Sequence, residues 1–117
     1  LLLHKENGRP IQLADRYINP RLGGDFLAQD FRHITPSAYL LSLFPVTEIE
    51  HVIEAVVPEA WVREHLAINE VEPCLVLHRR TWVGEVIATS STFYYPGSRH
   101  SIGGRFKPGA SGSLAIA

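Results

Sequence analysis

Residues 73–106 constrain the fold of this chain more than any other stretch. Two segments rich in β-branched and aromatic residues lie on either side of a short corner that contains Gly84. Such a pair of segments is typical of an antiparallel β-hairpin. Pro96 and Gly97 then predict a second reversal of the chain. We therefore expect a three-stranded meander here, with its last strand ending near Phe106.

A second hairpin is expected at the start of the chain. Asn7 and Gly8 separate two strand-like segments, residues 1–5 and 10–18, and Asn-Gly is the dipeptide that most favours a two-residue hairpin turn. Side chains alternate along a strand, so the second segment has two distinct faces. One face carries Ile11, Leu13, Asp15 and Tyr17, and the other carries Gln12, Ala14, Arg16 and Ile18.

Short helices and one further strand are expected between the two hairpins. Residues 25–31 are expected to form one or two helical turns. Thr35 is a favourable N-cap for a helix that should run to about residue 44. Residues 46–57 alternate as a strand with one drier face. A second short helix should open at Pro58, with three side chains packing inward: Trp61, His65 and Leu66.

The expected elements number six or seven strands and two or three short helices, joined by hairpins rather than by long crossovers. This pattern indicates an α+β fold with a mainly antiparallel β-sheet. A length of 117 residues with 45% apolar and 20% charged side chains suits one globular domain. We place that domain at residues 1–106 and expect residues 107–117 to form a loose tail. Because the chain begins with Leu1, we expect it to be an N-terminally truncated piece.

Charge and cysteine content exclude several classes of function. The formal net charge is −1, and no basic run is longer than Arg79–Arg80, which argues against direct binding of nucleic acid by this chain. Cys74 is the only cysteine, so an intrachain disulfide is impossible and a reducing, cytoplasmic setting is expected. No apolar run approaches the roughly 18 to 20 residues that a membrane span requires.

No catalytic or metal signature is present in the sequence. The six histidines lack the spacing of a zinc-binding helix, and a single cysteine cannot build a thiolate zinc site. Ser90, Ser91 and Ser98 do not occupy a nucleophile elbow. We therefore expect no metal, no cofactor and no enzymatic activity.

Two places could hold a small anion. The start of the helix after Thr35 offers unpaired backbone donors and a positive dipole end, to which Thr35 and Ser37 add hydroxyl groups; alternatively, Thr35 only caps the helix. Arg80 could grip a carboxylate with two parallel hydrogen bonds. Its alternative role is an ion pair with Glu54.

Further polar candidates follow in the 86–106 segment. Thr89, Ser91 and Tyr95 are expected on one strand face, where they could line a pocket, although solvent exposure would explain small hydroxyl groups equally well. Arg99 and His100 follow the second reversal. His100 could exchange one hydrogen bond with a ligand, but an exposed histidine is the more ordinary outcome.

Several fragments resemble one known family when they are taken in order. They are residues 9–20, 29–31, 35–40, 50–56, 77–82, 95–99 and 103–106. Together they resemble the C-terminal effector-binding domain, called UTRA, of HutC-type histidine-utilisation repressors in the GntR superfamily. The resemblance implies a chorismate lyase-like fold, a homodimer, and a winged helix-turn-helix domain that precedes this chain and binds DNA.

The resemblance also suggests a ligand. Relatives often carry glutamates for polar sugar effectors where this chain has Ala14 and Thr89, so a flatter, less hydroxylated molecule such as urocanate is expected. Arg80 and the Thr35 helix start could hold its carboxylate. Candidates for its ring nitrogens are Asp15, Glu54 and His78, and candidates for stacking on its ring are Tyr17, Trp82, Phe93 and Tyr95.

Two alternatives remain open. The domain could sense a different effector, such as a sugar phosphate or a fatty acid, with the same fold and a changed pocket. It could also be an enzyme similar to chorismate lyase. In either case the membrane is not an expected partner.

Overall fold

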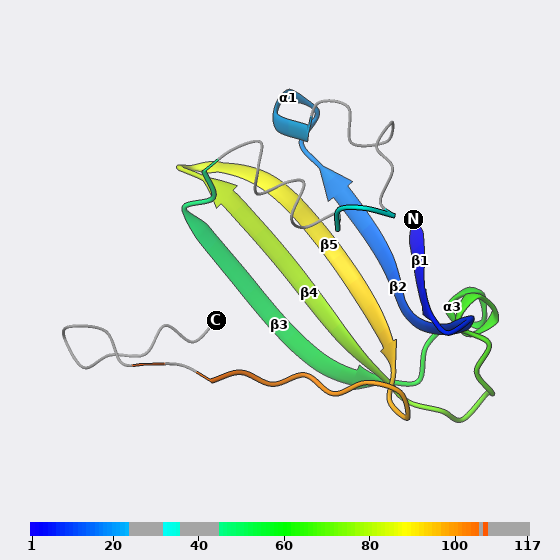
Figure 1. The fold of residues 1–117 in the computed structure, drawn as a ribbon. Coiled ribbons are helices and arrows are strands. Elements are labelled where there is room, and N and C mark those ends of the chain that lie inside the picture. Colours follow the sequence, from blue (N-terminus) through cyan, green and yellow to red (C-terminus); the bar gives the residue numbers. More distant parts are fainter. Residues whose placement is uncertain (24–31, 36–44, 106, 108–117) are drawn as a thin grey trace.

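The computed structural model describes residues 1–23, 32–35, 45–105 and 107, and in them one five-stranded sheet dominates (Figure 1). All neighbouring strands are antiparallel, in the order β1-β2-β5-β4-β3. The elements are β1 (Leu2–Glu6), β2 (Arg9–Ile18), α1 (Pro20–Gly23), β3 (Glu48–Val56), α3 (Ala60–Leu66), β4 (Cys74–Val83) and β5 (Val86–Pro96). The α+β class with a mainly antiparallel sheet is confirmed.

The predicted central hairpin is confirmed as β4 and β5, which pair from Cys74 and Pro96 to the corner at Gly84. Gly84 has a φ of +60°, a conformation that glycine adopts without steric cost. The predicted third strand of the meander is wrong for the described part of residues 98–106, none of which lies in a strand. The reason is topological: β2 already pairs with the free side of β5, so no edge remains beside β5.

The first hairpin is also confirmed, with β1 and β2 joined by Asn7 and Gly8. Both turn residues have positive φ angles, 53° and 75°, as expected for the mirror-image turns that match the twist of two strands. Beyond β2, the chain enters the single helical turn α1, where the side-chain oxygen of Asn19 accepts a hydrogen bond from the backbone N–H of Arg21 at 3.0 Å. This turn was not predicted.

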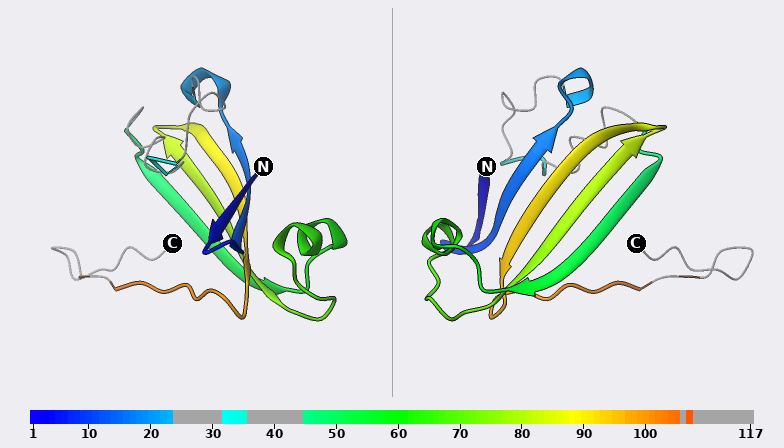
Figure 2. Two further views of the ribbon diagram at one scale, coloured as in Figure 1. Left: turned by 45° about the vertical axis from the view of Figure 1, so that its right-hand side comes forward. Right: turned by 180° about the vertical axis from the view of Figure 1, so that it is seen from behind.

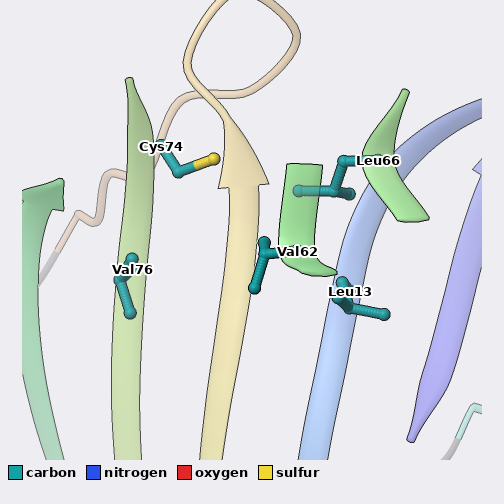
Figure 3. Packing of buried hydrophobic residues seen from close by; sticks show 5 residues of the cluster. All are labelled: Leu13, Val62, Leu66, Cys74 and Val76. Carbon is teal, nitrogen blue, oxygen red and sulfur yellow. The ribbon is translucent and has the colours of Figure 1, made fainter. Parts of the chain in front are cut away.

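Helix α3 packs against one end of one face of the sheet and builds a core cluster there (Figure 3). Its residues Val62 and Leu66, one helical turn apart, are buried. They pack with three sheet residues: Leu13, Cys74 and Val76. The prediction that Trp61, His65 and Leu66 pack inward is correct for Leu66 and partly for Trp61, whose ring meets the Tyr94 ring edge-to-face at 5.8 Å although the residue is 38% exposed. It is wrong for His65, because an inward stripe through residues 62 and 66 leaves position 65 exposed.

Strand β3 forms one edge of the sheet. The prediction that one of its two faces is drier is wrong. Ile49 and Ile53 on one face and Val52 on the other are all about half exposed. In the part of the sheet that the structure describes, β3 pairs on one side only, with β4. The alternation along the strand is therefore correct, but neither face is dry.

The remaining predicted elements lie outside the described residues. They include the helical turn at 25–31, the body of the helix after Thr35 with Ser37, and all of the tail except Lys107. Figure 2 shows α1 and α3 at opposite ends of the sheet. No helix in the described part of the chain is long and apolar enough to cross a membrane.

Candidate functional site

The face of the sheet opposite α3 carries a row of polar side chains that crosses four strands. Arg16 on β2, Ser91 on β5, Arg79 on β4 and His51 on β3 are directly paired in register. Residues that are directly opposite on neighbouring strands point to the same face, so the four side chains share this side. Local sequence patterns do not predict this row, because its members are up to 75 positions apart in the chain.

A pocket of about 300 Å³ opens on this face. We call it the arginine pocket. It reaches from the polar row toward β1. Its lining residues are His4, Gln12, Arg16, Thr35, Arg79, Phe93 and Tyr95.

Two guanidinium groups converge over one aromatic ring in the arginine pocket. The central guanidinium carbons of Arg16 and Arg79 lie 4.9 Å and 5.3 Å from the centroid of the buried Phe93 ring. The ring's negative π face attracts both cations. Burial, and then the charge of Arg79, lower the pKa of Arg16 to about 10, while Tyr95 opposes this shift. Arg16 therefore stays charged at neutral pH, and the pair favours an anion between its members.

The other end of the arginine pocket is polar but not cationic. Gln12 donates a hydrogen bond from Nε2 to the hydroxyl of Tyr95 at 2.9 Å, and the Tyr95 ring stacks on His100 with centroids 4.1 Å apart. Burial, and then the charge of Arg16, lower the pKa of His4, which keeps this imidazole neutral at physiological pH. Neutral groups here can both donate and accept hydrogen bonds.

Four predicted site residues lie on the face of the arginine pocket. Thr35 and Tyr95 line it. Ser91 is buried in the polar row between the two arginines. Thr89 is also buried, and its hydroxyl is 2.6 Å from the hydroxyl of Thr81. The Thr89 hydroxyl therefore makes its hydrogen bond within the sheet.

Four other predicted site residues lie on the opposite face, with α3: Tyr17, Glu54, His78 and Arg80. Arg80 donates a hydrogen bond from Nε to Glu50 at 2.7 Å, and its guanidinium lies 5.2 Å from the centroid of a Trp82 ring. His78 contacts Glu54 at 2.7 Å. The predicted alternative pair, Arg80 with Glu54, is therefore wrong. The strand register puts Glu50 opposite Arg80 and moves Glu54 four residues away.

Arg99 has a structural place in the fold. Its Nη1 donates to the carbonyl oxygens of Pro10 and Leu66, both at 3.0 Å, and its Nη2 donates to that of Ala67 at 3.3 Å. These bonds join the turn after β5 to β2 and to the end of α3. Ser37 lies outside the described residues.

Sequence reasoning missed four pocket residues: His4, Gln12, Arg16 and Arg79. The alternation along β2 already placed Gln12 and Arg16 together. On β4 the alternation of apolar and polar residues is weak, because apolar residues occupy both faces from Cys74 to Leu77. The sequence therefore does not show whether Arg79 or Arg80 lies on the face of the pocket. A search for arginines on the face opposite the amphipathic helix would have found the pair.

The arginine pocket suits binding rather than metal chemistry. Within residues 1–23, 32–35, 45–105 and 107, no three His, Cys, Asp or Glu side chains gather closely enough to hold a metal ion. Guanidinium, amide, hydroxyl and imidazole groups can hold a planar anion by hydrogen bonds. The fold belongs to the α+β class, and the chemistry of this pocket suits a small anionic ligand.

The sequence matches the UTRA domain over residues 1–101, and the chain therefore belongs to the UTRA domain family. It is 47% identical over 106 residues to the histidine utilization repressors of Pseudomonas aeruginosa and Pseudomonas putida. These alignments cover 91% of this chain but 42% and 43% of the two repressors, so the chain spans less than half of their length. The predicted resemblance to HutC-type repressors is confirmed.

A solved structure supports the same relationship. The crystal structure of the C-terminal domain of the histidine utilization repressor from Pseudomonas syringae pv. tomato str. DC3000 superposes with a TM-score of 0.83 and is 46% identical. The match covers 90% of this chain and 74% of that domain. These relatives are named as repressors and not as enzymes, which agrees with the expectation of a non-enzymatic domain.

Proposed function

We propose that this chain is the effector-sensing domain of a GntR-superfamily repressor of histidine utilisation, and that its arginine pocket binds urocanate or a related small anionic metabolite. The observation that carries this proposal is the convergence of Arg16 and Arg79 over Phe93, in a chain that is 47% identical to histidine utilization repressors. The two guanidinium groups can bind an acidic ligand. The names of the relatives indicate histidine utilisation as the pathway.

The two guanidinium groups are suited to a carboxylate. Each can give two parallel hydrogen bonds to its oxygens, and such charge-assisted bonds are stronger than neutral ones. Arg16 is partly buried, so its field on a bound anion is less screened than at an open surface.

The shape of the arginine pocket suits a short planar acid with a polar ring. Along β2, Arg16 and Gln12 are four positions apart, which corresponds to about 13 Å of extended strand. A ring that lies over Phe93, with its acid group at the arginines, would present its far edge to His4, Gln12 and Tyr95. An imidazole both donates and accepts hydrogen bonds there. The volume of about 300 Å³ lies at the small end of ligand pockets.

DNA binding itself would come from outside this chain. We propose that a preceding winged helix-turn-helix domain reads the operator in the cytoplasm as part of a homodimer, since this chain has a net charge of −1 and no concentrated basic run. Urocanate would bind one arrangement of the dimer more tightly and shift the population toward it.

Calorimetric titration of the chain tests the proposal. Urocanate should bind saturably at neutral pH, and its uncharged amide should bind at least about tenfold more weakly, because a lost charge-assisted hydrogen bond costs about 1.5 to 3 kcal/mol. Equal affinity for the acid and the amide would contradict a carboxylate grip.

Two further ligands separate the alternatives. Binding of N-acetylglucosamine 6-phosphate without binding of urocanate would favour a sugar-phosphate sensor. Release of product from chorismate would favour an enzyme. Histidine serves as a matched control, because it carries the same ring and carboxylate with an added ammonium group that two nearby guanidinium groups would repel.

A further inference from the structure

His51 contacts Arg79 but is not among the residues that line the arginine pocket. It lies on edge strand β3, directly opposite Arg79 in the register. Arg79 donates a hydrogen bond from Nε to His51 Nε2 at 2.9 Å. Nε is the guanidinium nitrogen bonded to the side-chain methylene groups. This bond therefore leaves the two Nη groups at the end of the side chain able to donate to a ligand.

The bond with Arg79 fixes the chemical state of His51. Nε2 can accept a hydrogen bond only when it carries no proton, so the imidazole must be neutral with its proton on Nδ1. A protonated ring would have no lone pair and would face a guanidinium. Burial, and then the charge of Arg79, lower the pKa of His51, in agreement with the geometry.

The groups that face His51 in the described part of the sheet come from β4 and β3. Arg79 is the charged one, and the next members of the polar row are Ser91 and Arg16. Glu50 and Glu54 belong to the opposite face by strand alternation. The flanking residues on the same face carry no charge: Ile49, Ile53, Leu77 and Thr81.

We propose that His51 is a positioning residue that orients the guanidinium of Arg79 over Phe93 for the ligand carboxylate, and that acidification uncouples it by protonating Nε2. This inference rests on the proposed function, since it assigns the residue that prepares the arginine pocket. Without a hydrogen-bond acceptor for Nε, the long side chain of Arg79 would sample several rotamers. Ligand binding would then have to order this side chain, and the entropic cost would weaken the affinity for the ligand.

Two variants separate positioning from a general loss of structure. His51→Ala removes the acceptor and should weaken urocanate binding about tenfold at about pH 8. His51→Gln keeps an oxygen that can accept from Arg79 Nε and should restore affinity to within about threefold of the original chain. His65→Gln, on the exposed side of α3, is the matched control and should change nothing. Equal losses in His51→Ala and His51→Gln would overturn the proposal.

The pH dependence gives a second readout. Between about pH 8 and pH 5.5 the ligand's own titration affects all variants alike, so the ratio of the dissociation constant of His51→Gln to that of the original chain removes it. That ratio should fall on acidification, because only the original chain loses its acceptor. A ratio that stays constant or rises would overturn the proposal.

A ligand-free measurement keeps this inference distinct from the proposed function. The Nε–H signal of Arg79, identified by its loss in Arg79→Lys, can be followed by nitrogen-15 NMR as the pH falls. It should titrate together with the His51 ring and stay fixed in His51→Gln. If urocanate fails to bind while this titration is present, the proposed ligand is wrong and the Arg79–His51 coupling stands. If urocanate binds but the signal does not follow His51, the positioning role is wrong.

Discussion

Arg79 and Arg80 are neighbours in the chain but serve opposite faces of the sheet. Arg79 lies over Phe93 in the arginine pocket. Arg80 pairs with Glu50 on the face that α3 shares, with about half of its side chain exposed. Two residues of the same chemistry and almost the same position therefore form a natural test pair.

Replacing each arginine by alanine should give opposite results. Arg79→Ala should weaken urocanate binding by about 10- to 100-fold, because charge-assisted hydrogen bonds to the ligand are lost. Arg80→Ala should change affinity by less than about threefold and stability by less than about 1 kcal/mol, since exposed ion pairs contribute little. Calorimetric titration measures the first effect and urea denaturation the second. Loss of binding in Arg80→Ala alone would place the ligand on the α3 face.

Arg99 should matter for stability and not for ligand recognition. Its three hydrogen bonds to carbonyl oxygens hold the end of α3 and the start of β2. Arg99→Ala should lower the free energy of unfolding by about 2 to 3 kcal/mol, because it removes charge-assisted bonds and leaves helix-end carbonyls without a partner. Arg105→Ala, at an exposed position, is the control and should stay within about 0.5 kcal/mol. Urea denaturation distinguishes them, and an unchanged midpoint in Arg99→Ala would refute this role.

The hydroxyl groups of Thr81 and Thr89 should be energetically coupled. They are 2.6 Å apart and buried. Each single change to valine should cost about 1 to 3 kcal/mol, because it leaves one buried hydroxyl unsatisfied. The double change should cost less than the sum, since it removes both polar groups at once. A double-mutant cycle by chemical denaturation measures this coupling, and strictly additive effects would argue against the bond.

Stability should fall on mild acidification because of His4 and His51. Burial is the largest cause of the lowered pKa in both, followed by the charge of a neighbouring arginine. In the unfolded chain these rings take up protons near their ordinary pKa of 6.5, whereas in the folded chain they do so only at lower pH. The unfolded state then binds more protons, so the free energy of unfolding decreases as the pH falls below about 6.5.

Thermal melting between about pH 7.5 and pH 5.5 measures this effect. The melting temperature should drop by a few degrees on acidification. Replacing His4 and His51 together by glutamine should make the curve flatter, while His65→Gln should leave it unchanged. A slope that is equal in all three proteins would assign the pH dependence to other groups.

Local sequence was sufficient for the hairpins and for the alternation of side chains. Asn7 and Gly8 adopt the positive φ angles that their turn requires, a preference that depends on the two residues themselves. The split of β2 into a Leu13 face and an Arg16 face follows from the two-residue period of any strand. Leu66 was correctly expected to pack inward, but its partner Val62 was not, because a seven-residue helix gives too few positions to define a stripe.

The arrangement of strands could not be predicted in the same way. The third meander strand was expected because Pro96 and Gly97 do reverse the chain, but a turn does not specify what pairs next. Strand β2, more than 70 positions earlier, occupies the side of β5 that the third strand would need. The partner of Arg80 was misassigned for the same reason, because it depends on the register between β3 and β4.

The sequence by itself determined which side chains share a strand face and where the hairpins turn, because these depend on neighbours within a few residues. The order of short fragments along the chain also indicated the family. Tertiary structure alone decided which face of the sheet carries α3 and which carries the arginine pocket. That choice follows from burying Val62 and Leu66 against Leu13 and Val76. Once the apolar surface of α3 packs against one face, Arg16 and Arg79 must lie together on the other.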